Sequence, residues 1–377
     1  MNVIFTCGGT GGHINPAIAV ANIVKERYPD SKILFVGAKG HMEEQLVPQA
    51  GFALKCLTIS GMKRGKNWDA IKKNVKTVAD TVKAVQECKK LIREFQPDVI
   101  LGTGGYACFP ALMAGTLMKI PTCVHESNAV PGLTTRMLAD RVDRVLVSFE
   151  ESVAWYKHPE RVKVVGMPVR RDFIYTNKEE ARKALGLGDG PVVVSAFGSQ
   201  GAKAMNEVTA ELFRLEKEAG YPFHHIHATG KFGWEWMPEL VKSKGVTLEG
   251  NSQIDMREYI YNMPTVMAAA DVFISRSGAS TCNEIAASGT PCILIPSPNV
   301  TDNHQEKNAR VLEENGGAVV VLEKECTAEK LYEAVTKLLA DVQIRDKMST
   351  ALRKRVILDS AEQICSIMES LVQSGKR

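Results

Sequence analysis

Three glycine-rich segments in this 377-residue chain have the composition of anion-binding loops. They are Gly8–His13 (GGTGGH), Phe197–Ala202 (FGSQGA) and Ser275–Thr281 (SRSGAST), each placed between an apolar run and a segment of helical period. Backbone N–H groups at a helix start favour anions, so two such starts aimed at one place could hold a diphosphate without a metal. A turn from strand to helix often needs glycine for conformational reasons alone, and that reading stays open for any single segment.

Two common nucleotide-binding motifs do not fit these segments. The dinucleotide pattern G-x-G-x-x-G, started at Gly9 and Gly11, would need its third glycine at Ile14. The second apolar run ends at Ala38 and Lys39 without the acidic residue that holds the ribose of NAD. No G-x-x-x-x-G-K-[ST] pattern occurs either. The sequence therefore argues against a dehydrogenase and excludes a P-loop NTPase.

The elements that must position these segments alternate between short Val- and Ile-rich runs and longer helical segments, which is the pattern of parallel sheets. The alternation occurs twice along the chain. Strands are expected near Val3–Cys7, Lys32–Val36, Val99–Gly102, Thr122–His125 and Val145–Ser148, then near Pro191–Phe197, Phe223–Ala228, Asp271–Ser275, Cys292–Ile295 and Ala318–Val321. Helices are expected near Pro16–Arg27, Trp68–Glu94, Pro110–Leu117, Met205–Ala219 and Ala279–Ser288.

Chain length and turn-forming residues divide this pattern into two domains. A chain of 377 residues exceeds what one core usually organises, and residues 166–190 are rich in turn formers. We expect an α/β protein with two Rossmann-like parallel-sheet domains, 1–165 and 191–355, facing across a cleft and joined by a hinge at 166–190. A terminal helix at 356–377 has apolar residues at helical spacing that need a surface to cover, which either domain could supply. These residues are Ile364, Ile367, Met368 and Leu371.

Composition points to an enzyme of the cytosol. The chain is 45% apolar, 24% charged and 6% aromatic, and its nine cysteines have no metal-ligand spacing, as expected of free thiols in a reducing compartment. No secretion signal and no apolar run of about 18 residues is visible, so we expect any membrane contact to be peripheral.

Positive charge is concentrated between Met62 and Arg93, a stretch that contains ten Lys or Arg residues and three acidic residues. Within this stretch an apolar stripe at three- and four-residue intervals predicts an amphipathic helix. The stripe consists of Ile71, Val75, Val78, Val82 and Val85, with Trp68 at its start. It suits packing into the domain core, and it equally suits docking on an anionic membrane with Lys63, Arg64 and Lys66 at the headgroups. Nucleic-acid binding is disfavoured, because aromatic residues for base stacking are absent apart from Trp68.

Over essentially its whole length the chain resembles the membrane-associated N-acetylglucosaminyltransferases that convert lipid I to lipid II, which are two-domain enzymes of the GT-B fold. The matching blocks are Gly8–His13, His125–Asn128, Pro168–Arg170, Gly198–Ala202, Arg276–Ala279, Glu284–Ala286, and Gln305 with Asn308. Their order and spacing are far more specific than any one block. The chain departs from the family at Met167, where asparagine is usual, and at Phe197, where a glycine is common.

The resemblance implies transfer of GlcNAc from UDP-GlcNAc, with inversion, to the muramyl 4-hydroxyl of lipid I at the cytoplasmic face of the bacterial membrane. It implies that Ser199 and Arg170 contact the diphosphate, that the backbone at Ile260 reads uracil, and that Glu284 accepts the ribose hydroxyls. Gln305 and Asn308 would bind the GlcNAc ring. The remaining residues implied to contact the donor are Thr10, Gly11, Gly12, Asn128, Ala279, Ser280 and Thr281.

An inverting displacement requires a general base, and His13 is the candidate, because histidine titrates near neutrality. His13 could instead only donate a hydrogen bond to the substrate, and His125 and Glu126 are reserve candidates. No Asp-x-Asp motif is present, and we assign structural roles to His224, His225 and His227. We therefore expect no cofactor or protein-bound metal, while stimulation by a free divalent cation stays open.

Two other functions compete with this interpretation. A related GT-B enzyme could use the same donor on another lipid such as diacylglycerol, because only the resemblance ties Gly104–Tyr106 and His125–Asn128 to a muramyl acceptor. A non-catalytic scaffold that keeps the fold is less compatible with His13, Glu284 and Gln305 all being present.

Overall fold

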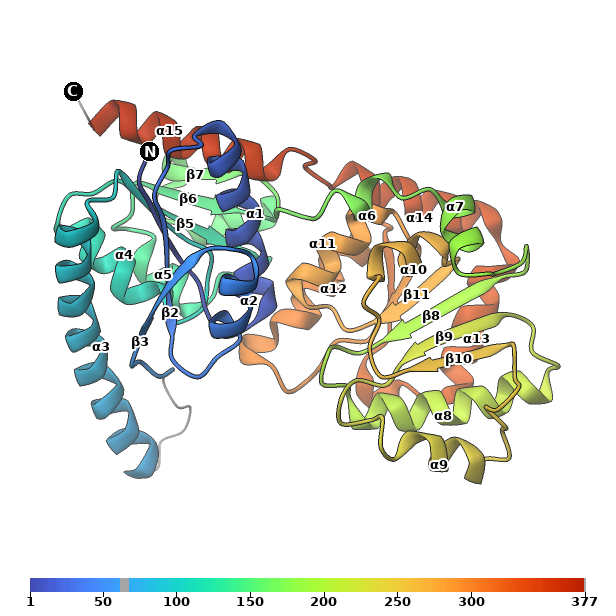
Figure 1. Ribbon diagram of the computed structural model, residues 1–377. Helices are drawn as coiled ribbons and strands as arrows, with labels where there is room; N and C mark the ends of the chain where they lie inside the picture. Colours follow the sequence, from blue (N-terminus) through green and yellow to red (C-terminus); the bar gives the residue numbers. More distant parts are fainter. Residues whose placement is uncertain (62–67, 376–377) are drawn as a thin grey trace. The chain divides into compact units, whose positions relative to one another are not determined.

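The structure is a computed structural model that describes residues 1–61 and 68–375, and the chain forms two compact units (Figure 1). The first unit comprises Met1–Val169 together with Ile357–Arg377, and the second comprises Arg170–Val356. The first division point lies within the stretch predicted as the hinge. From Arg170 onward this stretch packs within the second unit, where Lys178 and Arg182 both form ion pairs with Asp271, at 2.6 and 2.7 Å.

The first unit is built on a seven-stranded parallel sheet of order β3-β2-β1-β4-β5-β6-β7. Its strands are β1 (Val3–Thr6), β2 (Ile33–Ala38), β3 (Ala53–Leu57), β4 (Val99–Gly102), β5 (Thr122–Glu126), β6 (Arg144–Val147) and β7 (Val162–Val164). Residue Val3 of β1 lies opposite Ile33 of β2 on one side and Val99 of β4 on the other. The strand order reverses beside β1, and ligands of open parallel sheets bind at the carboxyl ends of strands at such a point.

Helices cover both faces of this sheet, because alternate residues of a strand point to opposite sides. Val3 and Phe5 contribute to a core with α1 and α15, whereas Ile4 contributes to a second core with α3 and α4. The helices of this unit are α1 (Gly11–Arg27), α2 (Glu43–Gln49), α3 (Trp68–Phe95), α4 (Cys108–Leu117), α5 (Leu133–Leu138) and α15 (Ser360–Gly375), with short 3₁₀ turns at Glu150–Trp155 and Pro159–Arg161.

The terminal helix α15 packs on the first unit, beside α1 (Figure 1). Ile364 and Met368 are fully buried in the core that α1 shares, and Ile367 and Leu371 pack at its edge. Arg27 at the end of α1 also forms an ion pair with Glu369, with 3.1 Å between Nη1 and Oε1. The apolar stripe of the last helix thus covers the surface of the domain that holds the first glycine-rich segment.

The second unit has a six-stranded parallel sheet of order β10-β9-β8-β11-β12-β13. Its strands are β8 (Val192–Ala196), β9 (His224–Ala228), β10 (Ile254–Arg257), β11 (Val272–Ser275), β12 (Cys292–Leu294) and β13 (Ala318–Val320). Its helices are α6 (Asp172–Tyr175), α7 (Lys178–Ala184), α8 (Lys203–Glu218), α9 (Met237–Ser243), α10 (Met263–Ala269), α11 (Ala279–Ser288), α12 (His304–Glu314), α13 (Ala328–Ala340) and α14 (Val342–Lys354), with 3₁₀ turns at Thr301–Asn303 and Glu323–Glu325. Both glycine-rich segments of this unit follow central strands, β8 and β11.

A buried polar chain lies between β8, β9 and α8. Glu216 Oε1 is 2.7 Å from His225 Nδ1, and Ser195 Oγ is 2.7 Å from both His225 Nε2 and His227 Nδ1. Burial lowers the pKa of His227. Ser195 Oγ therefore bridges the two imidazole rings, and the Glu216 carboxylate contacts the other ring nitrogen of His225. The histidines predicted to be structural at 225 and 227 are therefore part of the core.

Replacing Ser195 by alanine is expected to destabilise the second unit by about 2 kcal/mol, because two buried imidazoles lose their shared partner. Ser195 is 1% exposed, so water cannot take its place without a rearrangement. Urea denaturation followed by circular dichroism measures the change. Ser243→Ala, at an exposed residue of α9, is the matched control and is expected to change the free energy of unfolding by less than about 0.5 kcal/mol. A Ser195→Ala variant as stable as the wild type would contradict the assignment.

Candidate active site

The first glycine-rich segment joins the central strand β1 to α1. The helix begins at Gly11, earlier than the predicted Pro16, since the N–H groups of His13 and Ile14 already bond to Thr10 O at 3.0 and 3.2 Å. Thr10 is exposed, and Gly11 and Gly12 are half-buried. The prediction that His13 lies on a loop is therefore wrong, because it belongs to the first helical turn.

His13 is held by the turn that follows β4. Its Nδ1 lies 3.1 Å from the carbonyl oxygen of Thr103, and the hydroxyl of Thr103 donates to His13 O at 2.6 Å. A carbonyl oxygen can only accept, so Nδ1 carries the proton and Nε2 the lone pair in the neutral ring. A Cβ on Gly104, where φ is +111°, would lie 2.4 Å from Nδ1, which explains glycine at that position. The ring is half-buried and has the tautomer that a general base requires.

The alternative candidates for the general base, His125 and Glu126, both form hydrogen bonds within the first unit. His125 is fully buried with Nε2 2.8 Å from Gly166 O, and burial lowers the pKa of its imidazole. Both carboxylate oxygens of Glu126 accept backbone N–H groups, from Asn128 at 3.0 Å and from Gly132 at 2.9 Å. Glu126 also accepts the side-chain amide of Asn128 at 2.9 Å. Glu126 thereby orients Asn128, which the resemblance implies contacts the donor.

In the second unit, the segment after β8 presents Ser199 to solvent. The carbonyl oxygens of Ser199 and Gln200 accept the N–H groups of Lys231 and Phe232, at 3.1 and 3.2 Å. Gly201, with φ at +81°, approaches the loop after β9 so closely that a Cβ would lie 2.1 Å from Thr229 O. The loop conformation is therefore fixed by its neighbour before α8 begins.

The side chain of Phe197, at a position where the family often has glycine, connects two glycine-rich segments of this unit. The buried Phe197 ring lies 6.1 Å from the ring of His227 and 6.0 Å from the guanidinium carbon of Arg276. Arg276 belongs to the third segment and is held by Glu323 and by Ile295 O. The Phe197 ring thus links the loop after β8 to the loop after β11. A glycine at this position has no side chain and could not make this contact.

The third segment leads into α11, which begins at Ala279 with Ser280 and Thr281 half-buried in its first turn. Further along the same helix stands Glu284, also half-buried. Burial raises the pKa of the Glu284 carboxyl to about 7, and the positive charge of Arg170 acts in the opposite direction. The structure therefore brings Arg170, Glu284 and the start of α11 into one neighbourhood of the second unit. Arg170 is exposed and 3.3 Å from Asp172.

The residues implied to bind the sugar ring, Gln305 and Asn308, lie on α12. The Gln305 side-chain oxygen accepts the N–H of Ser297 at 2.8 Å, and its backbone oxygen accepts the hydroxyl of Ser277 at 2.8 Å. Asn308 is fully buried, and its amide donates to Ser277 O at 3.3 Å. Both residues thus hold the loop that precedes α11, and their contact with a sugar stays a prediction.

Ile260 follows β10, at the same edge of the sheet as the loops after β8 and β11. Its side chain is 2% exposed, whereas Tyr261 beside it is 87% exposed. The rings of Tyr259 and Tyr261 meet edge to face with centroids 4.9 Å apart. Two aromatic rings that contact each other therefore lie next to Ile260 in the chain, at the carboxyl end of the sheet where the predicted nucleotide would lie.

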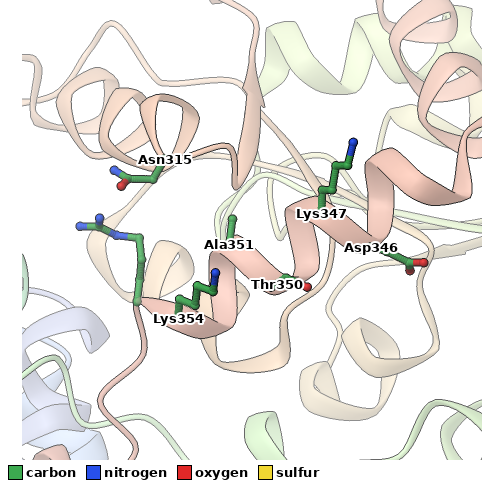
Figure 2. A pocket seen from close by; sticks show the side chains of 7 residues that line it. Asn315, Asp346, Lys347, Thr350, Ala351 and Lys354 are labelled. Carbon is green, nitrogen blue, oxygen red and sulfur yellow. The ribbon is translucent and has the colours of Figure 1, made fainter.

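A separate hollow of about 600 Å³ lies along α14 and contains none of the predicted site residues (Figure 2). Lys347, Thr350 and Lys354 line it, with Asn315 from the end of α12 opposite them. Most of its lining side chains are exposed, so it lacks the buried polar groups that a specific binding site presents to a ligand. Within the described residues, no group of three or more His, Cys, Asp or Glu side chains is arranged to hold a metal ion.

Comparison with known proteins assigns this architecture to a class. The model of the glycosyltransferase family 28 N-terminal domain matches residues 3–147, and that of the family 28 C-terminal domain matches residues 192–364. The crystal structure of Acinetobacter baumannii MurG has a TM-score of 0.77 and 24% identity, covering 98% of this chain and 99% of that one. The fold and these matches define a two-domain glycosyltransferase of the GT-B type.

Curated relatives narrow the assignment further. A Thermoanaerobacter protein is 43% identical over 98% of this chain and 100% of its own length, and an Acetivibrio thermocellus protein is 40% identical over 99% of each. Both are named UDP-N-acetylglucosamine–N-acetylmuramyl-(pentapeptide) pyrophosphoryl-undecaprenol N-acetylglucosamine transferase. The chain belongs to this transferase family.

Proposed function

We propose that this protein transfers GlcNAc from UDP-GlcNAc to the 4-hydroxyl of MurNAc in lipid I, forming lipid II for peptidoglycan synthesis. The observation that carries the proposal is the grouping of Ser199, the α11 start and Glu284 on one sheet edge, in a chain of this family. Helix N-termini and Arg170 suit a diphosphate, and a carboxylate suits a ribose diol. The donor proposed for these groups is UDP-GlcNAc.

The chemistry follows from the groups each unit supplies. His13 Nε2 takes the proton of the attacking 4-hydroxyl as the new glycosidic bond forms at the anomeric carbon. The bond from that carbon to UDP breaks at the opposite face, which inverts the configuration. Negative charge then grows on the diphosphate, where backbone N–H groups of the second unit and Arg170 stabilise it. The proposal needs no protein-bound metal for this step.

The transfer assay that tests this function compares two acceptors. Radiolabelled UDP-GlcNAc is supplied with lipid I in one reaction and with diacylglycerol in the other. We expect label in a lipid II product and release of UDP only with lipid I. Labelled diacylglycerol would favour the related lipid glycosyltransferase, and no UDP release with either acceptor would favour a non-catalytic scaffold.

The surface of α3 supports a membrane-facing position for the first unit. Of the predicted apolar stripe, Val85 is buried, but Val75, Val78 and Val82 are 66%, 53% and 58% exposed. Core packing is therefore the wrong explanation for these three valines. Their neighbours Lys72, Lys76 and Lys83 are exposed as well. The predicted contacts of Lys63, Arg64 and Lys66 lie outside the described residues.

An apolar stripe flanked by lysines matches an anionic bilayer, because each lysine near the surface contributes on the order of 1 kcal/mol and valines enter the acyl boundary. We propose that the chain binds in this way to the cytoplasmic leaflet that carries its lipid acceptor. In the described part of the chain, the helices are too short or too polar to span a bilayer.

The triple variant Val75→Ser, Val78→Ser, Val82→Ser is expected to weaken binding to vesicles containing anionic lipid by about tenfold or more. Vesicle flotation at two salt concentrations measures this. Val342→Ser, at a 57% exposed valine of α14, is the matched control and should bind as the wild type does. Wild-type binding that ignores anionic lipid and salt would contradict the proposal, as would a dimer that covers the stripe in sedimentation experiments.

A further inference from the structure

A buried carboxylate lies behind the first glycine-rich segment. Glu43, the first residue of α2, is 0% exposed. Its Oε1 accepts the N–H of Ala38 at 2.9 Å, and its Oε2 accepts the N–H of Gly9 at 3.1 Å. Removing a carboxylate from water is costly unless its oxygens are hydrogen-bonded, so these two contacts hold the carboxylate and the backbone together.

Glycines on two strand ends make room for this carboxylate. A Cβ on Gly8 would lie 2.7 Å from Glu43 Oε1, and a Cβ on Gly37 would lie 2.6 Å from Glu43 Cγ. Gly9 adopts a φ of +89°, a conformation that side chains disfavour, and this backbone aims its N–H at the carboxylate. The glycine content of the segment is therefore explained in part by Glu43, besides any ligand.

The opposite side of the segment touches the turn that holds His13. A Cβ on Gly105 would lie 2.5 Å from Gly8 O, and Gly104 contacts the His13 ring. The backbone at Gly8 and Gly9 is thus enclosed by Glu43 on one side and by the Gly104–Gly105 turn on the other. A shift of this backbone would move the start of α1, where His13 lies.

We propose that Glu43 is a positioning residue for the transfer reaction. Its carboxylate fixes the backbone of Gly8–Gly12 through the N–H of Gly9, and thereby sets the place of His13, without touching a substrate. This inference rests on the proposed function. Sequence patterns could not reveal it, because Glu43 and Gly9 are 34 residues apart and no motif links them.

The variant Glu43→Gln tests this proposal with little change of shape. An amide has one accepting oxygen, and its NH₂ group must face one of the two backbone N–H groups. We expect kcat for lipid I to fall about 10- to 100-fold, the effect of one lost hydrogen bond to a charged group. The Kd for UDP should stay near the wild-type value, because the proposed diphosphate and ribose contacts of Ser199, Arg170 and Glu284 lie in the second unit. Glu44→Gln, at the exposed neighbour, is the control and should leave kcat unchanged.

Hydrogen exchange of the peptide covering residues 8–13 distinguishes positioning from general stabilisation. In Glu43→Gln we expect faster exchange there and unchanged exchange in β4 and β5. Unchanged kcat, or exchange that rises throughout the first unit, would overturn the proposal. If Glu43→Gln does not fold, Glu43→Asp keeps the charge but cannot reach both N–H groups, and the same fall in kcat is expected. A wild type inactive on lipid I would refute the proposed function, while the exchange data would still test the loop contact.

Discussion

Replacing His13 by alanine is expected to lower kcat for transfer to lipid I by about 10²- to 10⁴-fold, the range typical of general base catalysis. The hydrogen bond from Nδ1 to Thr103 O puts the proton of the neutral ring on Nδ1, so Nε2 is the nitrogen proposed to accept the proton of the acceptor hydroxyl. The Kd for UDP-GlcNAc should change little, because the proposed nucleotide contacts come from Ser199, Glu284 and Arg170 of the second unit. Steady-state kinetics with lipid I and calorimetric titration with UDP-GlcNAc measure the two quantities.

A second variant separates proton transfer from positioning. His13→Asn keeps a donor near the place of Nδ1, so it can still bond to Thr103 O, but it has no basic nitrogen. We expect it to be as slow as His13→Ala. His158→Ala, at an exposed histidine beside Glu160, is the control for loss of an imidazole and should keep full activity. Wild-type turnover by His13→Asn would remove His13 from the role of base and leave only hydrogen bonding.

Glu284 is expected to make donor binding depend on pH. The carboxyl has a pKa of about 7 in the folded protein, so it is largely protonated at pH 6 and ionised at pH 8. A ribose diol is bound best by the ionised form, which accepts both hydroxyls. Binding should therefore release a proton below pH 7, and the Kd for UDP-GlcNAc should be about tenfold weaker at pH 6 than at pH 8.

Substitution of the same carboxylate should remove this dependence. Glu284→Gln is expected to weaken UDP-GlcNAc binding at pH 8 by about 100-fold, because hydrogen bonds to a charged group are lost. Its Kd should be nearly the same at pH 6 and pH 8. UDP-GlcNAc is the appropriate ligand, since its diphosphate is a diester and does not titrate in this range. A wild-type Kd independent of pH, or a pH-dependent Glu284→Gln, would contradict the role of Glu284.

Central strands and the edge strand β13 could be predicted from the sequence, whereas the edge strands β3, β7 and β10 could not. β1 and β4 are buried on both faces, so their residues form continuous apolar runs. The strands absent from the prediction, β3, β7 and β10, lie at sheet edges. Their exposed positions, such as Lys55 in β3 and Lys163 in β7, interrupt the apolar run that marks a buried strand.

Periodicity predicted α3 but could not identify its covered face. Small and polar side chains at Thr77, Ala84 and Cys88 face the core, while Val75 and Val78 are exposed. Small residues allow close approach to α4, which packs along α3. A stripe of valines in the sequence predicts that another surface covers it. Only the structure shows that the rest of the first unit leaves Val75, Val78 and Val82 exposed.

The candidate site was predictable where chemistry lies in local sequence and not where it depends on distant contacts. The glycine-rich segments and His13 are visible as motifs, and the structure places each at the carboxyl end of a central strand. Three other features arise only when the chain folds. They are the hydrogen bonds that Glu126 accepts from Asn128 and Gly132, the burial of Asn308, and the hydrogen bond that Glu43 accepts from Gly9. From residue type alone, Glu43 and Glu126 would appear equally available for catalysis.

A crystal structure with UDP-GlcNAc bound tests the central claim most directly. We predict the diphosphate against the loop at Ser199 and the first turn of α11, with both ribose hydroxyls within hydrogen-bond distance of the Glu284 carboxylate. Nucleotide bound elsewhere, for example in the hollow lined by Lys347 and Lys354, or a ribose out of reach of Glu284, would contradict the account.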